Sequence, residues 1–514
     1  MAILNRFFSI FLLSFLLLPI FTFAQQDSTS NDGKKEVEIL NADNLKLSEV
    51  NGVKTTELIG NVQLRQEQLI LFCDRAVLDK NTNSFDAFGN VKFQNQEVDG
   101  FSNFLKYWGD KKLLMLQGKV ILTDQKMQLH AEEVFYNNIN KIAFYYTGGV
   151  VYREKSIIRS QQGYYYTKNG NIYFNKNVDI KDPEYHLTSD TLLYNVDNDI
   201  TVFFGNTIID NKSSQIYCDN GWFDTKRNIA SFGKNTKIVD GNNILISDSL
   251  YYERATGFGK LLDNFHWKDT TMKVDIFGEK AEYKEEKAFV KVWQKAWMIY
   301  DLENDSLYLT ADTLISTNRS KTDSTKDFYA YHNARLYTDN MQAKCDSLFY
   351  SFSDSVFRFH QSPILWNDST QMTGISIFIA MKNKKIDQLT INENAFIIYP
   401  SGKQLNDQVK GKNIYGFFKE NQLAFVNVLQ NAESLYFGKE DNGKYLGANK
   451  TLSTNMNIYF KDKKMDRITF IEKPEAVFTP MKKLTKEAYT MEGFNWLWNK
   501  RPVYPTFFFD KYIK

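Results

Sequence analysis

The most constraining feature of this chain is a short phrase that recurs about every 29 residues. The clearest copies begin Gly60-Asn61-Val62, Gly89-Asn90-Val91 and Gly118-Lys119-Val120. Successive anchor positions are separated by 29, 29, 30, 28, 29, 29 and 29 residues, and the anchors are Val62, Val91, Val120, Val150, Val178, Thr207, Thr236 and Phe265. A period this steady indicates stacked repeats, each too small to bury a core of its own. The chain should therefore fold into an elongated body.

Each copy of the phrase alternates between apolar and polar residues. The anchor and the residue two positions later form an apolar face, whereas their sequence neighbours, such as Asn61, Gln63 and Lys92, are polar and lie on the other face. This period of two predicts a half-buried strand, and its repetition predicts a sheet with one continuous apolar face. The candidate groove residues on that face are Val62, Leu64, Val91, Phe93, Val120, Leu122, Val150, Tyr152, Val178 and Ile180.

A second phrase, of the form Asp-x-Leu-x-Tyr, lies about 12 residues after the anchor in several repeats. Turn-forming clusters such as Lys168-Asn169-Gly170-Asn171 connect it to the next anchor, which predicts hairpins and an antiparallel sheet. Its acidic residues are Asp74, Asp190, Asp219, Asp248, Asp312 and Asp346. A catalytic carboxylate pair is unique in a chain, whereas these residues recur from unit to unit. We therefore interpret them as strand-start residues that bond neighbouring backbone or face water.

Composition and scattered residue types narrow the possible functions. Charged residues of both signs are interspersed and the net charge is +2, which gives no basic stripe for nucleic acid. None of the five histidines has metal-ligand spacing to a cysteine or another histidine, so we expect no metal and no cofactor. Cys73, Cys218 and Cys345 share one repeat position and should lie too far apart for a disulfide, which predicts buried thiols.

The two ends of the chain differ in pattern from the repeats. Residues 1–24 carry an apolar run that ends in a small residue, which predicts a cleaved signal peptide; an uncleaved anchor helix is the alternative. Residues 25–37 are a polar linker, 38–267 hold the regular repeats, and 268–480 continue them more loosely with polar loop insertions. Residues 481–514 break the pattern and are expected to form a C-terminal cap or tail.

The apolar face of such a sheet must be covered, and three closures can cover it: a closed barrel, a two-walled trough or a parallel β-helix. The Asn, Asp and Gly turns suit hairpins rather than the parallel coils of a β-helix. A membrane barrel would place its polar side chains inward and its apolar ones outward. The favoured fold is therefore all-β, an elongated trough of antiparallel hairpins.

The Gly-Asn-Val and Asp-x-Leu-x-Tyr phrases, behind a signal peptide, resemble the OstA-like family, which includes LptA and the N-terminal domain of LptD. The resemblance is clear over residues 38–267 and weaker to Phe478. It implies a V-shaped antiparallel β-jellyroll, open along one side. It also implies a non-enzymatic bridge that shields the acyl chains of lipopolysaccharide during transport to, and assembly in, the outer membrane. The implied location is the periplasm, with the protein either free there or associated with the outer membrane.

The resemblance implies partners as well. They are lipopolysaccharide, the outer-membrane translocon, and other jellyroll-domain transport proteins, including a second copy of this chain; no nucleic acid is expected. Unpaired edge strands invite the addition of further strands, and residues 38–47 and 458–470 are the expected docking edges.

Two questions stay open on the residues alone. The apolar face can contact lipid, or it can pack across the two walls as an ordinary core; we expect deep positions to pack and positions near the open side to contact lipid. The second open question is the function, because two alternatives to lipid transport remain. A structural or adhesive cell-envelope protein with a filled core is the main rival, and a carbohydrate-active enzyme would need a carboxylate pair in a cleft.

Overall fold

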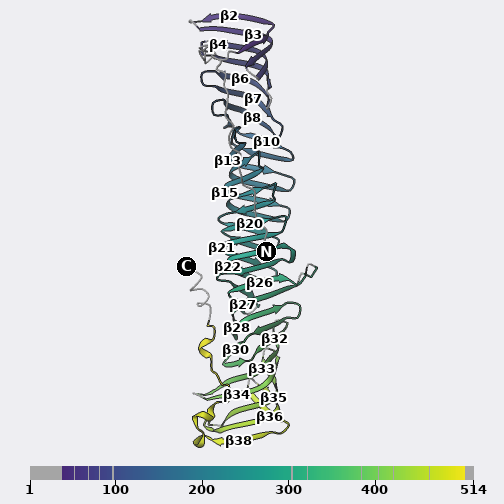
Figure 1. Ribbon diagram of the computed structural model, residues 1–514, viewed down its shortest axis with the longest axis vertical. Coiled ribbons are helices and arrows are strands. Elements are labelled where there is room, and N and C mark those ends of the chain that lie inside the picture. The colour runs from purple at the N-terminus through teal and green to yellow at the C-terminus, as the bar shows by residue number, and fades with distance from the viewer. Residues whose placement is uncertain are drawn as a thin grey trace, which may run out of the picture.

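The computed structural model describes residues 37–503, apart from 51–52, 67–68, 80, 95–97, 303–304, 321, 324, 384, 403–404, 421, 441 and 462–463. The predicted signal peptide and the linker up to residue 36 lie outside the described residues. Within the described part, 38 strands pair antiparallel in one long sheet (Figure 1). The predictions of an all-β fold and of an antiparallel sheet are confirmed.

Long strands cross the full width of the body, and short strands cover half of it. The first third contains β1 (Glu38–Asn41), β2 (Asn44–Val50), β3 (Val53–Gln66), β4 (Leu69–Asp79), β5 (Ser84–Gln94), β6 (Asp99–Trp108), β7 (Leu113–Thr123), β8 (Gln128–Asn137), β9 (Ile142–Tyr145), β10 (Gly149–Arg153), β11 (Ser156–Ser160) and β12 (Gln162–Tyr166). The middle contains β13 (Asn171–Lys181), β14 (Tyr185–Asn195), β15 (Ile200–Asn211), β16 (Ser214–Asp224), β17 (Ile229–Phe232), β18 (Thr236–Asp240), β19 (Asn243–Ser247), β20 (Ser249–Glu253), β21 (Phe258–Asp269), β22 (Val274–Lys284), β23 (Phe289–Trp293), β24 (Trp297–Asp301), β25 (Ser306–Thr310) and β26 (Thr313–Asn318). The last third contains β27 (Lys326–Tyr337), β28 (Met341–Ser351), β29 (Val356–His360), β30 (Ile364–Asn367), β31 (Thr370–Thr373), β32 (Ser376–Lys382), β33 (Lys385–Gly402), β34 (Leu405–Lys419), β35 (Gln422–Lys439), β36 (Tyr445–Lys461), β37 (Lys464–Ile471) and β38 (Glu475–Pro480). The described residues also form four short 3₁₀ turns, η1 (Glu285–Lys287), η2 (Met481–Lys483), η3 (Lys486–Tyr489) and η4 (Trp498–Lys500).

Many of the long strands bend at a corner made of successive residues with positive φ. In β3 these are Gly60 (φ 76°) and Asn61 (φ 46°). Glycine and asparagine enter this left-handed region more readily than other residues, which explains why the phrase begins with them. The two corner residues of β3 lie opposite a single residue of β4, Asp74. Ile59 before the corner pairs with Arg75, and Val62 after the corner pairs with Cys73. The recurring phrase is therefore a β-bulge that turns the strand.

The corners divide the sheet into two walls. Wall A contains the short strands β2, β9, β12, β17, β20, β23, β26, β29, β32 and β37, together with one half of each long strand. Wall B contains β1, β10, β11, β18, β19, β24, β25, β30, β31 and β38, together with the other half. Hairpin turns end both walls, and we call the line along which the turns of wall A face those of wall B the seam.

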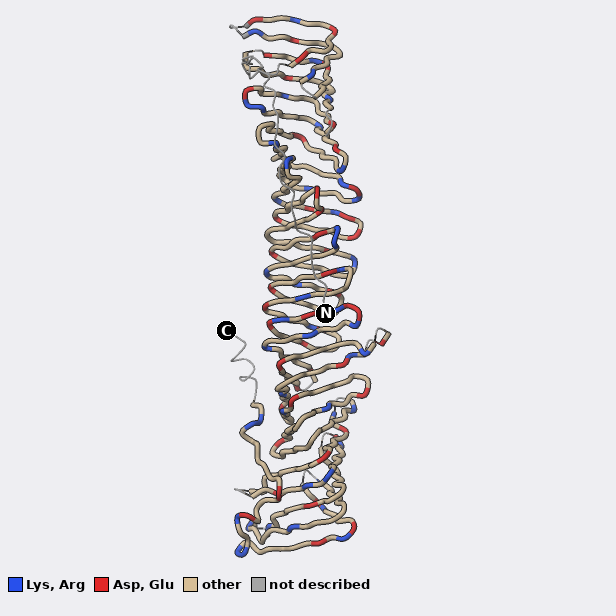
Figure 2. Tube along the Cα trace, viewed as in Figure 1, with Lys and Arg blue, Asp and Glu red and all other residues tan. Residues whose placement is uncertain are grey.

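The core of the protein lies between the walls. It consists of three successive buried clusters, which span residues 58–145, 151–196 and 203–458 and draw apolar side chains from both walls. Charged residues of both signs are spread along the whole length of the body (Figure 2). The favoured closure, a trough folded over its own apolar face, is the one observed.

The acidic residues of the second phrase mostly lie at the corners, so their interpretation as strand-start residues is wrong for most of them. Asp248 and Asp312 do precede β20 and β26, but Asp74, Asp190, Asp219 and Asp346 lie inside long strands. Asp74 lies beside the corner of β5, where its Oδ2 accepts a hydrogen bond from Asn90 Nδ2 at 3.0 Å. Asn61 donates to Asp43 at 2.9 Å in the same way. In both places a carboxylate thus holds the corner asparagine of a neighbouring strand.

Replacing Asp74 by alanine is expected to lower the free energy of local opening at the β4–β5 corner by about 1 kcal/mol, since one solvent-accessible hydrogen bond is lost. Hydrogen exchange of the β4 and β5 amides measures this change. Asp74→Asn keeps an acceptor oxygen in the same place and should retain most of the protection. Equal losses in the two variants would contradict the proposed role of the hydrogen bond.

Residues 481–503 leave the sheet after β38 and turn back along it, and we call this segment the strap (Figure 1). It packs on the outer face of wall B, where its Met491 is buried against Phe396, Ile398, Leu435 and Phe437. Buried glutamines bind its main chain. Gln408 Nε2 donates to the carbonyl oxygen of Tyr489 (2.8 Å), and Gln371 Nε2 donates to that of Asn495 (2.7 Å). The described part of the predicted cap or tail is therefore a strap along the side of the body.

Candidate functional site

The candidate functional site is the apolar interior between the two walls. Seven of the predicted groove residues are buried there: Val62, Leu64, Val91, Phe93, Val120, Val178 and Ile180. Leu122 lies on the same face and is half-buried against the first cluster. The phrase therefore identifies the inner face of the sheet correctly in these units.

The fourth unit is the exception, and the prediction that Val150 and Tyr152 face inward is wrong. Tyr152 is 40% exposed and its ring contacts His130, while Val150 lines a surface hollow with Lys119 and His130. Gly149 and Val151 take the inner positions, and Gly149 follows Val120 by the full period of 29 residues.

The room left by Gly149 is filled from a neighbouring strand. A Cβ atom at Gly149 would lie 2.6 Å from the ring of Tyr145, and a Cβ atom at Gly163 would lie 2.3 Å from the same ring. Tyr145 is buried, and its hydroxyl is 2.7 Å from Ser160 Oγ. One aromatic ring thus replaces two missing side chains of the inner face.

One row of the inner face of wall B is apolar on every strand that it crosses, and we call this row the track. Strand pairing orders its members as Ile39, Leu64, Leu71, Phe93, Gly100, Leu122, Leu129, Val151, Ile158, Ile180, Leu187, Ile209, Ile216, Ile238, Leu245, Trp267, Ile276, Met298, Leu309, Leu336, Ala343, Leu365, Met372, Ile397 and Val409. At about 4.8 Å per strand, the track runs for roughly 115 Å. Its length and uniform character suit an elongated apolar ligand that moves along it.

Burial along the track is uneven. Leu122 and Leu129 are half-buried, and so are Ile209, Ile216, Ile238 and Leu245. Between these stretches the track is buried at Val151, Ile158, Ile180 and Leu187. Exposure also rises with distance from the corner, since Thr207 at the corner is buried while Ile209 is half-buried. In these two stretches the track, which lies two residues from the corner, is therefore more accessible than corner residues such as Val120 and Thr207.

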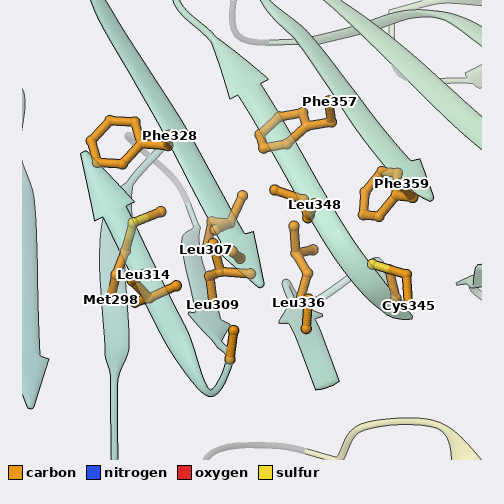
Figure 3. Close-up of a cluster of buried hydrophobic side chains, with 14 of the residues drawn as sticks. Met298, Leu307, Leu309, Leu314, Phe328, Leu336, Cys345, Leu348, Phe357 and Phe359 are labelled. Carbon is orange, nitrogen blue, oxygen red and sulfur yellow. The ribbon is translucent and has the colours of Figure 1, made fainter. Parts of the chain in front are cut away.

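From Trp267 to Met372 the track is buried and the interior is tightly packed. Side chains of both walls, among them Met298, Leu309, Phe328 and Leu348, point into one shared space (Figure 3). The cavity among them has a volume of only about 10 Å³. This section is packed like an ordinary protein core, so an acyl chain can enter it only if the walls move apart.

The interior offers an apolar surface and little reactive chemistry. The prediction of buried free thiols is confirmed for Cys73, Cys218 and Cys345, which lie beside the corners. Burial raises the pKa of the Cys73 thiol to about 11. No group of three or more His, Cys, Asp or Glu residues in the described ranges is arranged to hold a metal ion. In the same part of the chain, no helix has the length and apolar character needed to span a bilayer.

The sequence reasoning missed the row of glutamines under the strap. Gln342, Gln371 and Gln408 alternate with Trp366 and Ile398 across neighbouring strands of the outer face of wall B. All three glutamines are buried although they belong to the polar face of the alternation. The 29-residue spacing of Gln342 and Gln371 was the available signal, but an isolated Gln at a polar position looks like an ordinary surface residue.

The comparisons with known proteins bear on the N-terminal part of the chain. A family model described as OstA-like protein matches residues 34–190. The solved structures that match include LptH, the LptA homologous periplasmic component of the conserved lipopolysaccharide transport device from Pseudomonas aeruginosa. It is 8% identical, with 21% of this chain and 80% of that chain covered and a TM-score of 0.20. A search of curated proteins finds no match. Residues 34–190 of this chain are therefore similar to the OstA-like protein family, as the repeated phrases predict.

Proposed function

We propose that this protein is a non-enzymatic periplasmic bridge that shields the acyl chains of lipopolysaccharide during their transport to, and assembly in, the outer membrane. The observation that carries the proposal is the track, which is apolar on every strand from Ile39 to Val409. The OstA-like match of residues 34–190 supports the proposal at the level of the family.

The physical argument rests on the cost of exposing acyl chains to water. Each methylene group that leaves water contributes about 0.8 kcal/mol, so a lipid with several chains cannot cross an aqueous space unshielded at a useful rate. Because neighbouring track positions are chemically alike, an acyl chain changes its contacts little from one strand to the next. The half-buried stretches around Leu122 and Ile216 are the proposed contact sites.

The open edges of the sheet are the proposed docking sites for other jellyroll-domain transport proteins, a second copy of this chain and the outer-membrane translocon. Leu47 of β2 is 74% exposed at one end, and Val477 of β38 is 65% exposed at the other. The C-terminal edge consists of β37 and β38, which both pair with β36; Ile458 lies inside β36 rather than on the edge. Unpaired main-chain groups and exposed apolar side chains at both ends suit strand addition.

A structural envelope protein with a filled core is the second candidate. The packed interior around Met298 and Phe328, with its cavity of about 10 Å³, favours it for the C-terminal half of the body. It predicts that no lipid enters between the walls in any part of the molecule.

Photo-crosslinking separates the two candidates. A photoreactive amino acid placed at Leu122, Ile216 or Ile238 in the purified full chain is expected to form covalent adducts with added lipopolysaccharide, identified by mass analysis. The same group at Tyr152, which faces outward on wall B, is the matched control and should give no more adduct than background. Crosslinks only within the protein at all three inner positions would overturn the transport proposal and favour the structural one.

A further inference from the structure

Side chains from opposite walls meet across the seam in the middle cluster of the body. Arg153, at the end of β10 in wall B, forms an ion pair with Asp199, in the turn that ends wall A after β14. The Arg153 guanidinium carbon lies 4.5 Å from the centre of the Tyr194 ring, and the Tyr194 hydroxyl donates to Asp199 Oδ1 at 2.6 Å. The Arg153 and Asp199 side chains are largely shielded, with 24% and 20% of their surface exposed. We call Arg153, Tyr194 and Asp199 the seam lock.

The surroundings of the lock keep it charged and closed. Burial raises the pKa of Asp199, but hydrogen bonds from Tyr194, Arg153 and Lys226 outweigh this and hold that pKa below its usual range. Two further contacts join the walls on either side of the lock. Lys126 Nζ, in a turn of wall B, donates a hydrogen bond to the carbonyl oxygen of Val196, in a turn of wall A, at 3.0 Å. Arg254 Nη1 of wall A lies 3.9 Å from Glu184 Oε2 of wall B.

The lock coincides with the buried stretch of the track. Val151, Ile158, Ile180 and Leu187 are buried where the seam is closed. The track is half-buried before this stretch, at Leu122 and Leu129, and half-buried again after it, from Ile209 to Leu245. The seam lock therefore separates two accessible sections of one continuous apolar row.

This arrangement matters for any amphiphile that moves along the track. Its acyl chains can lie against the apolar face, but a hydrated or charged headgroup cannot enter the interior without a large desolvation cost. The headgroup must therefore project through the seam. A headgroup that reaches the lock cannot pass until the Arg153–Asp199 pair separates.

We propose that the seam lock is a gate that controls the passage of an amphiphile between the N-terminal and C-terminal sections of the track. The inference rests on the proposed function and adds a point of regulation to it. The two side chains keep 24% and 20% of their surface in contact with water, which suits a gate because both groups can be rehydrated when the pair separates.

The test closes the gate reversibly and follows lipid on both sides of it. In a full-length background with Cys73, Cys218 and Cys345 replaced by alanine, Lys126→Cys and Asp197→Cys are joined across the seam by a disulfide-containing bismaleimide. A photoreactive group at Leu129 or Ile216 then reports lipopolysaccharide on either side. The matched control joins Lys155→Cys to Asp182→Cys, two neighbouring turns of wall B that Ser156 and Asp182 already connect at 2.6 Å.

Of the two reporter positions, Leu129 and Ile216, the one that lipopolysaccharide reaches only after passing the lock forms its adduct more slowly, and we call it the slower-loading side. With the seam joined, the adduct at that position is expected to fall at least tenfold, and reductant should restore it. The wall-B control should leave both adducts unchanged. In a separate set without added cysteines, Arg153→Ala should speed loading of the slower side severalfold, and the charge exchange Arg153→Asp with Asp199→Arg should return it towards the original rate.

The two proposals fail in different ways. Equal adducts at Leu129 and Ile216 in the joined and reduced forms would overturn the gate while leaving the transport function in place. Absence of adduct at both positions in the reduced form would overturn the transport function itself.

Discussion

Replacing Gly163 by alanine is expected to destabilise the hairpins around β9 and β12 by about 3–5 kcal/mol. The new Cβ would lie 2.3 Å from the ring of the buried Tyr145, so the ring or the backbone must shift. Overpacking of a dense core costs about 1–3 kcal/mol, and displacement of the Tyr145 hydroxyl from Ser160 adds about 1–3 kcal/mol. Hydrogen exchange of the β9, β12 and β13 amides, read as a free energy of local opening, measures the change.

Gly259 supplies the matched control for this substitution. It is also a buried glycine in a strand of wall A, but a Cβ there would meet nothing closer than 3.5 Å. Gly259→Ala should therefore be neutral or stabilising by up to about 1 kcal/mol, because alanine loses less conformational entropy than glycine. Adding Tyr145→Leu to Gly163→Ala should recover part of the loss, and simple additivity of the two changes would contradict the proposed clash.

The same tyrosine shows where sequence reasoning reaches its limit. Most of the fold follows from the 29-residue period, because strand alternation reports directly which side chains face inward. In the fourth unit Val150 has the residue type of an anchor, whereas the residue that truly faces inward is Gly149. A glycine shows no preference for either face, and the ring that fills its place comes from Tyr145, four residues earlier and on another strand. Val120, Gly149 and Val178 are separated by 29 and 29 residues. Taking Val150 as the anchor in place of Gly149 turned these spacings into 30 and 28.

The candidate site was predictable to a similar extent. The inner face could be identified from residue types alone, since Val91 and Val178 keep the same place in the repeat. The opposition of Arg153 and Asp199 could not, because the two residues are 46 positions apart and belong to turns of different walls. Their meeting depends on how far one wall is shifted relative to the other, and the repeat pattern carries no information on that shift.

Replacing both Gln371 and Gln408 by alanine is expected to release the strap while leaving the sheet folded. Each glutamine makes two hydrogen bonds to strap main chain: Gln371 binds Asn495 O and Leu497 N, and Gln408 binds Tyr489 O and Met491 N. At about 1 kcal/mol per bond, the double variant loses on the order of 4 kcal/mol of strap attachment. A factor of ten corresponds to about 1.4 kcal/mol, so strap opening should rise by roughly several hundred-fold.

The released state should be distinguishable from general unfolding, because the strap contributes to a separate cluster on the outer face of wall B. Hydrogen exchange should accelerate across residues 484–497 while the amides of β33 and β34 stay protected. Opening also exposes Trp366, Ile398 and Phe437, which are buried in the intact protein, and an exposed apolar patch of this kind promotes self-association. Gln422→Ala, at an exposed position of β35, is the control and should change neither property. Loss of protection in β33 and β34 together with the strap would show instead that the strap and the sheet open as one unit, and that the glutamines stabilise the whole C-terminal end.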